Sequence, residues 1–291
     1  MLTDKQIEAR LKGLFGTDAS AIEGTNEYFG QLELYKIKRG EIGEDVLPNL
    51  AMGLGHTCEP DNIELIAKAI DKKVRRSNRT IWNKKLLCPE GKPFLGAHID
   101  GKVVGQDIIV ECKNVHYRSE SKWGEPGSDQ IPPNYKSQIK HYCLVTGIRK
   151  VIVGAIFMAW PDHRIYNVEF SDEEINDLYE LEWGFWGKVQ MGIEPPVDST
   201  RGCEQAIRRQ WPRVIDITET VEVDDHIKEA LDKLKKNKES VAELQKDEMR
   251  LKNEVRNKLK DRPLLVTPEG DVLATYKEDK RGTRVLRLTN N

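Results

Sequence analysis

The sequence predicts an α/β protein in which a mixed β-sheet has helices on both sides and is followed by a long helix and a β-hairpin. Two observations predict the sheet. First, up to residue 198, short apolar runs typical of strands alternate with segments whose apolar residues have helical spacing. Second, the run from Lys150 to Met158 is apolar almost throughout, as in a strand buried on both faces. A third observation predicts the long helix, because residues 224–260 are densely charged and contain neither Gly nor Pro.

The composition describes a globular protein with a polar surface. Of 291 residues, 38% are hydrophobic and 32% are charged, which allows one good-sized domain with an appendage. No apolar run approaches the roughly 20 residues that span a bilayer, and the N-terminus lacks a signal-peptide core. The five scattered cysteines disfavour zinc ribbons, disulfides and iron–sulfur clusters. We therefore expect a cytoplasmic protein. Its net charge of −2 means that a DNA-binding surface must gather basic residues locally.

The first 70 residues are expected to be mainly helical. Residues 3–15 have apolar side chains at helical spacing, a short second helix ends at Gly24, and residues 28–38 form a third. Residues 48–55 are expected to be a loop, after which Glu59-Pro60 opens a longer helix. A carboxylate in that first turn interacts favourably with the helix dipole, so a capping role is the plain alternative to a role in a site.

The stretch from Phe94 to Lys113 carries the strongest sign of chemistry. One apolar segment leads to Asp100 in an Asp-Gly turn, and a second leads to Glu111. Two strands joined by a Gly-bearing turn bring these carboxylates together at one end of a sheet. Strand alternation turns Glu111 and Lys113 to one face and Cys112 to the other. Two carboxylates suit Mg²⁺ or Mn²⁺, and a nearby lysine can orient or deprotonate a water.

The same pattern also has an ordinary interpretation. Glu-x-Lys recurs at Glu90, Glu120 and Glu278, and such a pair is usually a solvated ion pair. Glu111 differs because it ends a β-branched apolar run, where burying a charge without a partner is costly. On the residues alone, both interpretations stay open.

Other segments complete the first domain, which we place at residues 1–198. Two turn or cap signals mark helices, namely Pro132-Pro133 before a helix that stops at Gly147 and a capping box that begins at Ser171. The further elements expected are an edge strand over 74–82, a polar loop over 114–131, a strand over 163–170 paired with the run from Lys150, and a helix to about Met191.

The C-terminal part is expected to consist of a linker, a helix and a hairpin. Residues 199–223 are predicted to be the linker, residues 224–261 the helix, and residues 262–291 the hairpin. The helix has a heptad-like apolar seam with polar interruptions such as Asn237 and Glu248. It is therefore either a solvated surface helix or a weak coiled coil.

Several of these motifs, in this order, resemble those of the PD-(D/E)xK nucleases. More closely, they resemble those of the YqaJ-like viral recombinases, phage exonucleases that are related to lambda exonuclease. The resemblance rests on Gly16–Ile22, Glu59-Pro60, Asp100-Gly101, Glu111-Cys112-Lys113 and Gln138–Tyr142, and it runs from about residue 16 to 198. Tyr142 departs from the family, which often has Gln there, and fits the Gln-x-x-x-Tyr pattern of RecB-type nucleases.

The resemblance implies a PD-(D/E)xK, restriction-endonuclease-like core and a Mg²⁺-dependent exonuclease, with Mn²⁺ as a substitute. Such an enzyme degrades one strand of linear duplex DNA 5′ to 3′ for recombination by single-strand annealing. By resemblance, Asp100, Glu111 and the Cys112 carbonyl hold the metal, Lys113 activates a water, and Glu59 and Gln138 assist. The side chains expected to contact DNA are Tyr142, His141, Lys122, Trp123, Lys36 and Arg39.

The resemblance also implies partners. These are double-stranded DNA ends, a single-strand annealing protein, and further copies of the chain in a ring, typically of three subunits. A phage-encoded enzyme of this kind would work in the bacterial host cytoplasm. Two other functions stay open, an endonuclease or structure-specific nuclease on the same core and a non-catalytic DNA-binding protein.

Overall fold

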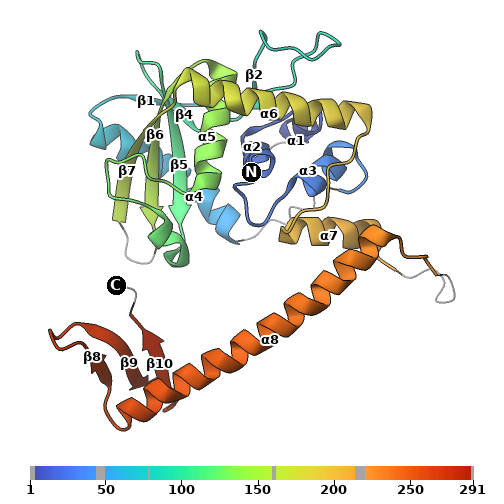
Figure 1. The fold of residues 1–291 in the computed structure, drawn as a ribbon. Helices are drawn as coiled ribbons and strands as arrows, with labels where there is room; N and C mark the ends of the chain where they lie inside the picture. The colour runs from blue at the N-terminus through green and yellow to red at the C-terminus, as the bar shows by residue number, and fades with distance from the viewer. Residues whose placement is uncertain (1–3, 44–49, 78, 159–161, 214–219, 290–291) are drawn as a thin grey trace. The chain divides into compact units, whose positions relative to one another are not determined.

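The structure, a computed structural model, describes residues 4–43, 50–77, 79–158, 162–213 and 220–289. The chain divides into two units, residues 1–214 and residues 215–291, which we describe separately (Figure 1). Among the described residues, no helix is long and apolar enough to cross a membrane.

A five-stranded mixed sheet forms the centre of the first unit. Its strand order is β1-β4-β5-β6-β7, and only β5 and β6 run parallel, because the connection between them contains α5. β6 is buried along nearly its whole length, as its apolar sequence predicts. The strands are β1 (Val74–Arg76), β4 (Gly101–Val103), β5 (Ile108–Val115), β6 (Lys150–Phe157) and β7 (Asp162–Glu169), and a separate pair consists of β2 (Ile81–Trp82) and β3 (Gly96–Ala97).

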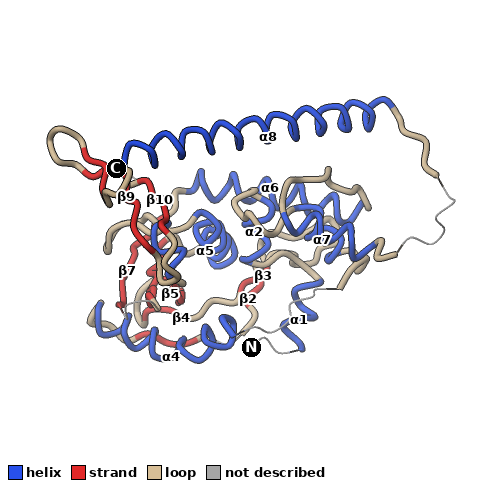
Figure 2. The backbone as a smooth tube through the Cα atoms, turned by 90° about the horizontal axis from the view of Figure 1, so that it is seen from below, coloured by secondary structure: helices blue, strands red, loops and turns tan. Residues whose placement is uncertain are grey.

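Helices cover both faces of this sheet. Figure 2 shows α4 on one side of the strands and α5 on the other. On the α4 side, Ile66 packs against Val110 and Ile152. On the α5 side, Ile139 packs against Ile109 in the larger core. The helices of this unit are α1 (Asp4–Leu11), α2 (Gly16–Ile22), α3 (Gln31–Lys38), α4 (Leu50–Ala69), α5 (Pro133–Thr146), α6 (Asp172–Met191), α7 (Arg201–Gln210) and the 3-10 helix η1 (Tyr117–Lys122).

Close packing of α4 on the sheet depends on a glycine in β6. A Cβ on Gly154 would lie 2.5 Å from the Asn62 amide oxygen and from Ile66. Asn62 is fully buried and donates a hydrogen bond to the Gly154 carbonyl at 3.0 Å. The missing side chain therefore lets the helix approach the strand closely enough for this bond.

Three predicted elements differ in the structure. The helix predicted to open at Glu59-Pro60 begins nine residues earlier, at Leu50, so Pro60 lies inside α4. The part of the helix before Pro60 contacts β5, because Asn114 donates a hydrogen bond to the Leu54 carbonyl at 3.1 Å, and Pro60 removes only one backbone bond of the helix. The edge strand predicted over 74–82 is split between β1 and β2, which belong to different sheets. Asn78, between them, lies outside the described residues.

The linker predicted over residues 199–223 contains a helix. Thr200 caps α7 by accepting a hydrogen bond from the Cys203 amide at 3.1 Å. Cys203 and Ala206 are buried, and Ala206 packs with Ile37 of α3. The apolar residues of α7 are few and are separated by charged residues, so the sequence did not indicate that this helix would pack on α3.

The described part of the second unit, residues 220–289, contains one helix and a small sheet. The predicted long helix is confirmed as α8 (Asp225–Leu259), whose N-terminal Asp224 accepts from the Ile227 amide at 2.8 Å. The predicted hairpin is confirmed, and the strand that the sequence also predicts from Arg284 to Leu288 pairs with it. The sheet has the order β10-β9-β8 and contains β8 (Leu264–Val266), β9 (Val272–Glu278) and β10 (Arg284–Leu288).

Candidate active site

Strand β5 presents Glu111 and Lys113 to the face that α5 covers, while Cys112 turns to the α4 side. This confirms the alternation expected from the sequence. The turn is different, because Asp100-Gly101 opens β4 and the hairpin reverses at residues 104–107, where Gly105 has a φ of 77°. Only Gly101 and Lys102 of β4 pair with β5. Beyond Val110, the backbone groups on this edge of β5 have no partner from β4, and the side chain of Asp100 lies beside them.

Asp100 fills the place of the missing strand partner. Its Oδ2 accepts a hydrogen bond from the Cys112 amide at 2.8 Å. In an extended strand the amide and carbonyl of one residue point to the same edge, so the Cys112 carbonyl also points toward Asp100. Burial raises the pKa of Asp100 well above its usual value, and the charge of Glu111 raises it further. Both carboxyl groups and this carbonyl therefore converge on one region.

Glu111 is a buried carboxylate with one oxygen left open. Only 3% of the residue is exposed. Its Oε1 accepts from Lys113 Nζ at 2.6 Å and from Gln138 Nε2 at 3.2 Å. Within the described residues, Oε2 has no hydrogen-bond partner. A buried carboxylate oxygen without a donor is costly, and a divalent cation that prefers oxygen ligands would satisfy it.

Lys113 is held as a charged group. Besides Glu111, its Nζ donates to the Gln138 side-chain oxygen at 2.8 Å and lies 4.5 Å from the centre of the Tyr135 ring. Burial by itself lowers the pKa of this lysine, but the charge and hydrogen bond of Glu111 outweigh it and hold the pKa above its usual value. The ammonium group therefore partly neutralises the carboxylates.

Helix α5 supplies the third wall of the site. Gln138 donates to the Tyr142 hydroxyl at 2.6 Å, one helical turn further on. Tyr142 is 5% exposed, and burial together with Glu111 raises its pKa well above the usual value. A Cβ on Gly16, the first residue of α2, would lie 2.5 Å from the Tyr142 ring and 3.1 Å from Gln138. The N-terminus of α2 thus fixes both side chains.

A buried charge network holds α2 in this position. Asp18, 1% exposed, accepts from the Phe15 amide at 2.9 Å and forms ion pairs with Lys38 at 2.7 Å and Arg10 at 3.8 Å. Burial works against the ionised form of Asp18, but Lys38 and Arg10 outweigh it, so its pKa is lower than usual. The charge of Asp18 therefore stabilises the fold beside the site.

Glu59 approaches the cluster from α4. Its Oε1 accepts from Arg76 of β1 at 2.8 Å, and His56 Nδ1 lies 3.8 Å from Oε2. The charge of Glu59 also raises the pKa of Asp100, after burial and Glu111, so it faces the same region. In the described ranges, three or more His, Cys, Asp or Glu side chains do not gather at any point in a way that could hold a metal. The candidate cation site is therefore two carboxylates and a backbone carbonyl.

The chain is similar to known proteins in sequence and in fold. Residues 6–149 match the YqaJ-like viral recombinase domain. The chain carries a YqaJ-like viral recombinase domain. The uncharacterized protein YqaJ of Bacillus subtilis (strain 168) is 27% identical over 272 residues, which cover 90% of this chain and 79% of that protein.

Two solved structures share the fold of the YqaJ-like domain. One is an alkaline exonuclease (LHK-Exo) from Laribacter hongkongensis, with a TM-score of 0.50 and 18% identity. The other is LHK-Exo in complex with dAMP, with a TM-score of 0.52 and 19% identity. Each alignment covers 66% of this chain and 95% of that chain. The predicted mixed sheet with helices on both sides is thereby confirmed.

Three of the predicted DNA contacts need correction, because the YqaJ-like domain buries their side chains. His141 is fully buried and donates from Nδ1 to Glu182 at 2.7 Å and from Nε2 to the Gly96 carbonyl at 2.9 Å. Lys36 is 2% exposed, with its Nζ 3.3 Å from Glu194. Trp123 is 7% exposed and packs against Tyr166. These side chains hold the fold together.

The other predicted contacts are differently placed. Tyr142 is buried at the site and positions Gln138. Lys122 and Arg39 are 51% and 43% exposed and lie beside Glu27 and Glu41, respectively. Their contact with DNA stays a prediction.

Sequence reasoning missed two residues of the site. Tyr135 lies one turn before Gln138 on α5, so helical periodicity could have found it. Arg76 could not have been found, because its partner Glu59 is 17 residues away on another element.

Proposed function

We propose that this chain is a metal-dependent nuclease that degrades one strand of linear duplex DNA from its 5′ end, for recombination by single-strand annealing. The observation that carries the proposal is the buried Glu111 Oε2, which lacks a hydrogen-bond partner among the described residues and lies in the carboxylate cluster with Asp100. The YqaJ-like domain and its fold relation to an alkaline exonuclease support the nuclease class.

Asp100, Glu111 and the Cys112 carbonyl would hold Mg²⁺, with Mn²⁺ as a substitute. When bound, the ion supplies a site for water and for the negative charge that develops on the phosphate. The remaining groups orient the reactants. Gln138 bridges Lys113, Glu111 and Tyr142, so it holds the lysine in one position. Glu59, fixed by Arg76, adds negative charge beside Asp100.

The role proposed for Lys113 follows from its protonation. A lysine whose pKa is raised by Glu111 carries its proton and donates hydrogen bonds, so in this state it orients a water or phosphate oxygen. Neutralising the charge of Glu111 removes the main cause of the raised pKa. Lys113 is then closer to the neutral form that can accept a proton from the attacking water.

The test is digestion of end-labelled linear duplex DNA, with Mg²⁺ and with EDTA, beside a closed circle of the same sequence. We expect cleavage of linear DNA with Mg²⁺ alone, with early loss of a 5′ label and late loss of a 3′ label. Asp100→Asn should remove cleavage. Asp107→Asn is the matched control, because Asp107 is an 86% exposed carboxylate on the adjacent turn. Cleavage of the closed circle at the same rate would instead identify an endonuclease, and cleavage that persists in EDTA would refute the metal site.

We also propose that the chain works on duplex ends as a ring of three copies, together with a single-strand annealing protein. A net charge of −2 gives weak electrostatic attraction to DNA, and a closed ring stays on its substrate without strong attraction. The exposed apolar residues along α8, such as Leu234 and Val241, offer a second route to association.

A further inference from the structure

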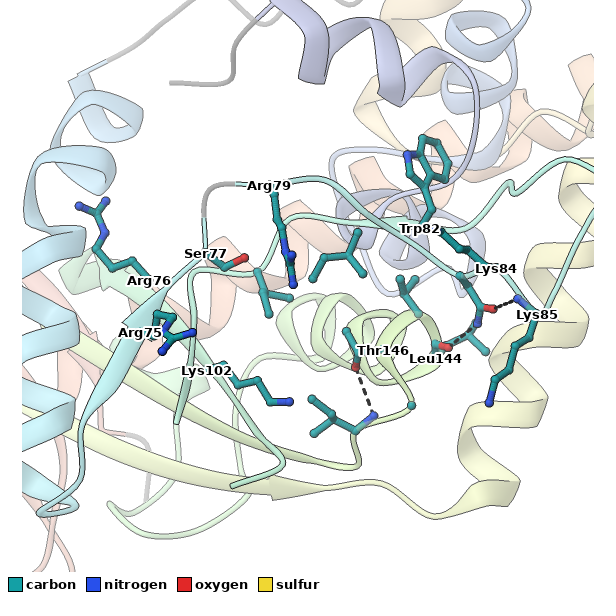
Figure 3. Close-up of a pocket in the computed structure, with 16 residues that line it drawn as sticks. Arg75, Arg76, Ser77, Arg79, Trp82, Lys84, Lys85, Lys102, Leu144 and Thr146 are labelled. Carbon is teal, nitrogen blue, oxygen red and sulfur yellow. Dashed lines mark hydrogen bonds between the residues drawn. The ribbon is translucent and has the colours of Figure 1, made fainter. Parts of the chain in front are cut away.

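A concave site outside the candidate active site, with a volume of about 890 Å³, lies between the β1–β2 segment and the C-terminal end of α5 (Figure 3). This volume falls within the range of pockets that hold small ligands, about 300–1,000 Å³. No acidic residue is among those that line it. Six basic residues do so, Arg75, Arg76, Arg79, Lys84, Lys85 and Lys102.

Three of the basic residues, on the side of the site formed by β1 and β4 and the segment after β1, point into it. Figure 3 shows Arg75, Arg79 and Lys102 directed toward the open space, whereas Arg76 turns away toward α4, in keeping with its ion pair to Glu59. Arg75 and Lys102 are cross-strand partners on β1 and β4, which places them side by side on one face. Lys102 also contacts Asp107, at 3.0 Å, but this carboxylate is 86% exposed, so the pair is weak.

Two of these cations lack a carboxylate partner among the residues that the structure describes. Neither Arg75 nor Arg79 forms an ion pair with a carboxylate of the described residues, and both are exposed. Like charges placed together repel one another, so the arrangement favours an anionic ligand. Guanidinium groups match phosphate oxygens in geometry as well as charge.

The opposite wall has a different chemistry. It consists of Leu144 and Val145 in the last turn of α5 and Ile148 just after the helix, and Ile99 completes the floor. Asn83 attaches the β2 segment to this wall by donating to the Leu144 carbonyl at 3.0 Å. The carboxyl end of a helix is electronegative, so it disfavours a phosphate and accepts apolar surfaces or N–H donors. A simple phosphate ion therefore matches only half of the site.

The site adjoins the candidate active site along the chain. Ile99 in its floor immediately precedes Asp100, and Lys102 follows two residues later. Arg75 is next to Arg76, which holds Glu59. A strand of DNA with a phosphate at the carboxylate cluster could therefore continue into the basic pocket.

We propose that this basic pocket binds single-stranded DNA, with phosphates on Arg75, Arg79 and Lys102 and with bases against the end of α5. The proposal rests on the proposed function. A single strand is favoured over a duplex because its base faces are open to an apolar wall, whereas a duplex presents phosphates and groove edges. The pocket would hold the strand on which the nuclease acts or the strand that it leaves behind.

The experiment is fluorescence anisotropy of a labelled 20-mer of deoxythymidylate with the full chain in EDTA, which separates binding from cleavage. The variant is Arg75→Gln with Arg79→Gln. The control is Lys233→Gln with Lys236→Gln, which removes the same charge from exposed positions on α8. Unchanged thermal unfolding of both variants would show that the fold is intact.

Loss of two phosphate contacts should lower the slope of log affinity against log salt by about 1.4. If the variant and the parent bind equally at 1 M salt, this difference in slope makes the variant bind about 25-fold more weakly than the parent at 0.1 M salt. The control should bind like the parent chain. The parent should bind a 20-mer of abasic sugar-phosphate less tightly than the deoxythymidylate strand, because the α5 wall then has no base to contact.

Three outcomes would overturn the proposal. The first is equal single-strand affinity of the pocket variant and the control. The second is that the pocket variant loses as much affinity for a duplex closed by hairpins at both ends as it loses for the single strand, which would make the pocket a duplex contact. The third is equal affinity of the parent for abasic and base-bearing strands. Because every measurement is made without metal, these results are independent of whether the chain cleaves DNA.

Discussion

Replacing Lys113 by Met is expected to destabilise the metal-free first unit by about 3–5 kcal/mol at pH 8. Lys113 and Glu111 form a buried ion pair at 2.6 Å, with side-chain exposures of 13% and 3%. Without the ammonium group, Glu111 keeps only the weaker bond from Gln138 at 3.2 Å, and Oε2 has no donor among the described residues. Methionine fills a similar volume, so the loss reflects the uncompensated charge more than a cavity.

The measurement is urea unfolding in EDTA, followed by tryptophan fluorescence. All six tryptophans lie within residues 1–214, so the signal reports on the unit that contains the site. The double variant Glu111→Gln with Lys113→Met is the control, because replacing both members of a buried pair by neutral groups is often nearly neutral. A single variant within about 1 kcal/mol of the parent would refute the reasoning, since its Glu111 could not then be a buried charge that depends on Lys113.

Four further predictions concern the metal, the pH dependence, the packing and the assembly. Mn²⁺ at 100 times its dissociation constant should stabilise the parent and Asp107→Asn by about 2.7 kcal/mol, and equal stabilisation of Asp100→Asn in the same unfolding assay would exclude Asp100 as a ligand. Asp18→Asn should lower stability by about 3 kcal/mol at pH 7. Because the pKa of Asp18 is lowered by folding, its contribution is complete above the unfolded value of about 3.9 and is lost as the pH falls through the folded pKa, so the two chains should converge in acid. Gly16→Ala, whose new Cβ meets the Tyr142 ring, should slow end-labelled DNA digestion by up to about 100-fold, and an unchanged rate would show that α2 does not position the site. Light scattering at micromolar concentration should give three times the monomer mass for both the full chain and residues 1–214, and a monomeric mass for both, with and without DNA, would rule out the ring.

Local patterns in the sequence were sufficient for much of the fold. Proline at the start of α5, glycine at its end and the capping box of α6 act through neighbouring backbone groups, so they predict helix ends without knowledge of the fold. The apolar run of β6 and the long charged helix α8 were found in the same way. Strand alternation also placed Glu111 and Lys113 on one face, where both contact Gln138.

Local patterns therefore identify the candidate site residues on β5 and the face of the strand that they occupy. The groups that surround these residues are known only from the folded structure. The Glu59–Arg76 pair, the burial of His141, the packing of α7 on α3 and the basic pocket beside α5 all join elements that are far apart in the chain. Such contacts depend on which surfaces lose water together, and burial of a side chain is a property of the assembled layers that no local pattern contains.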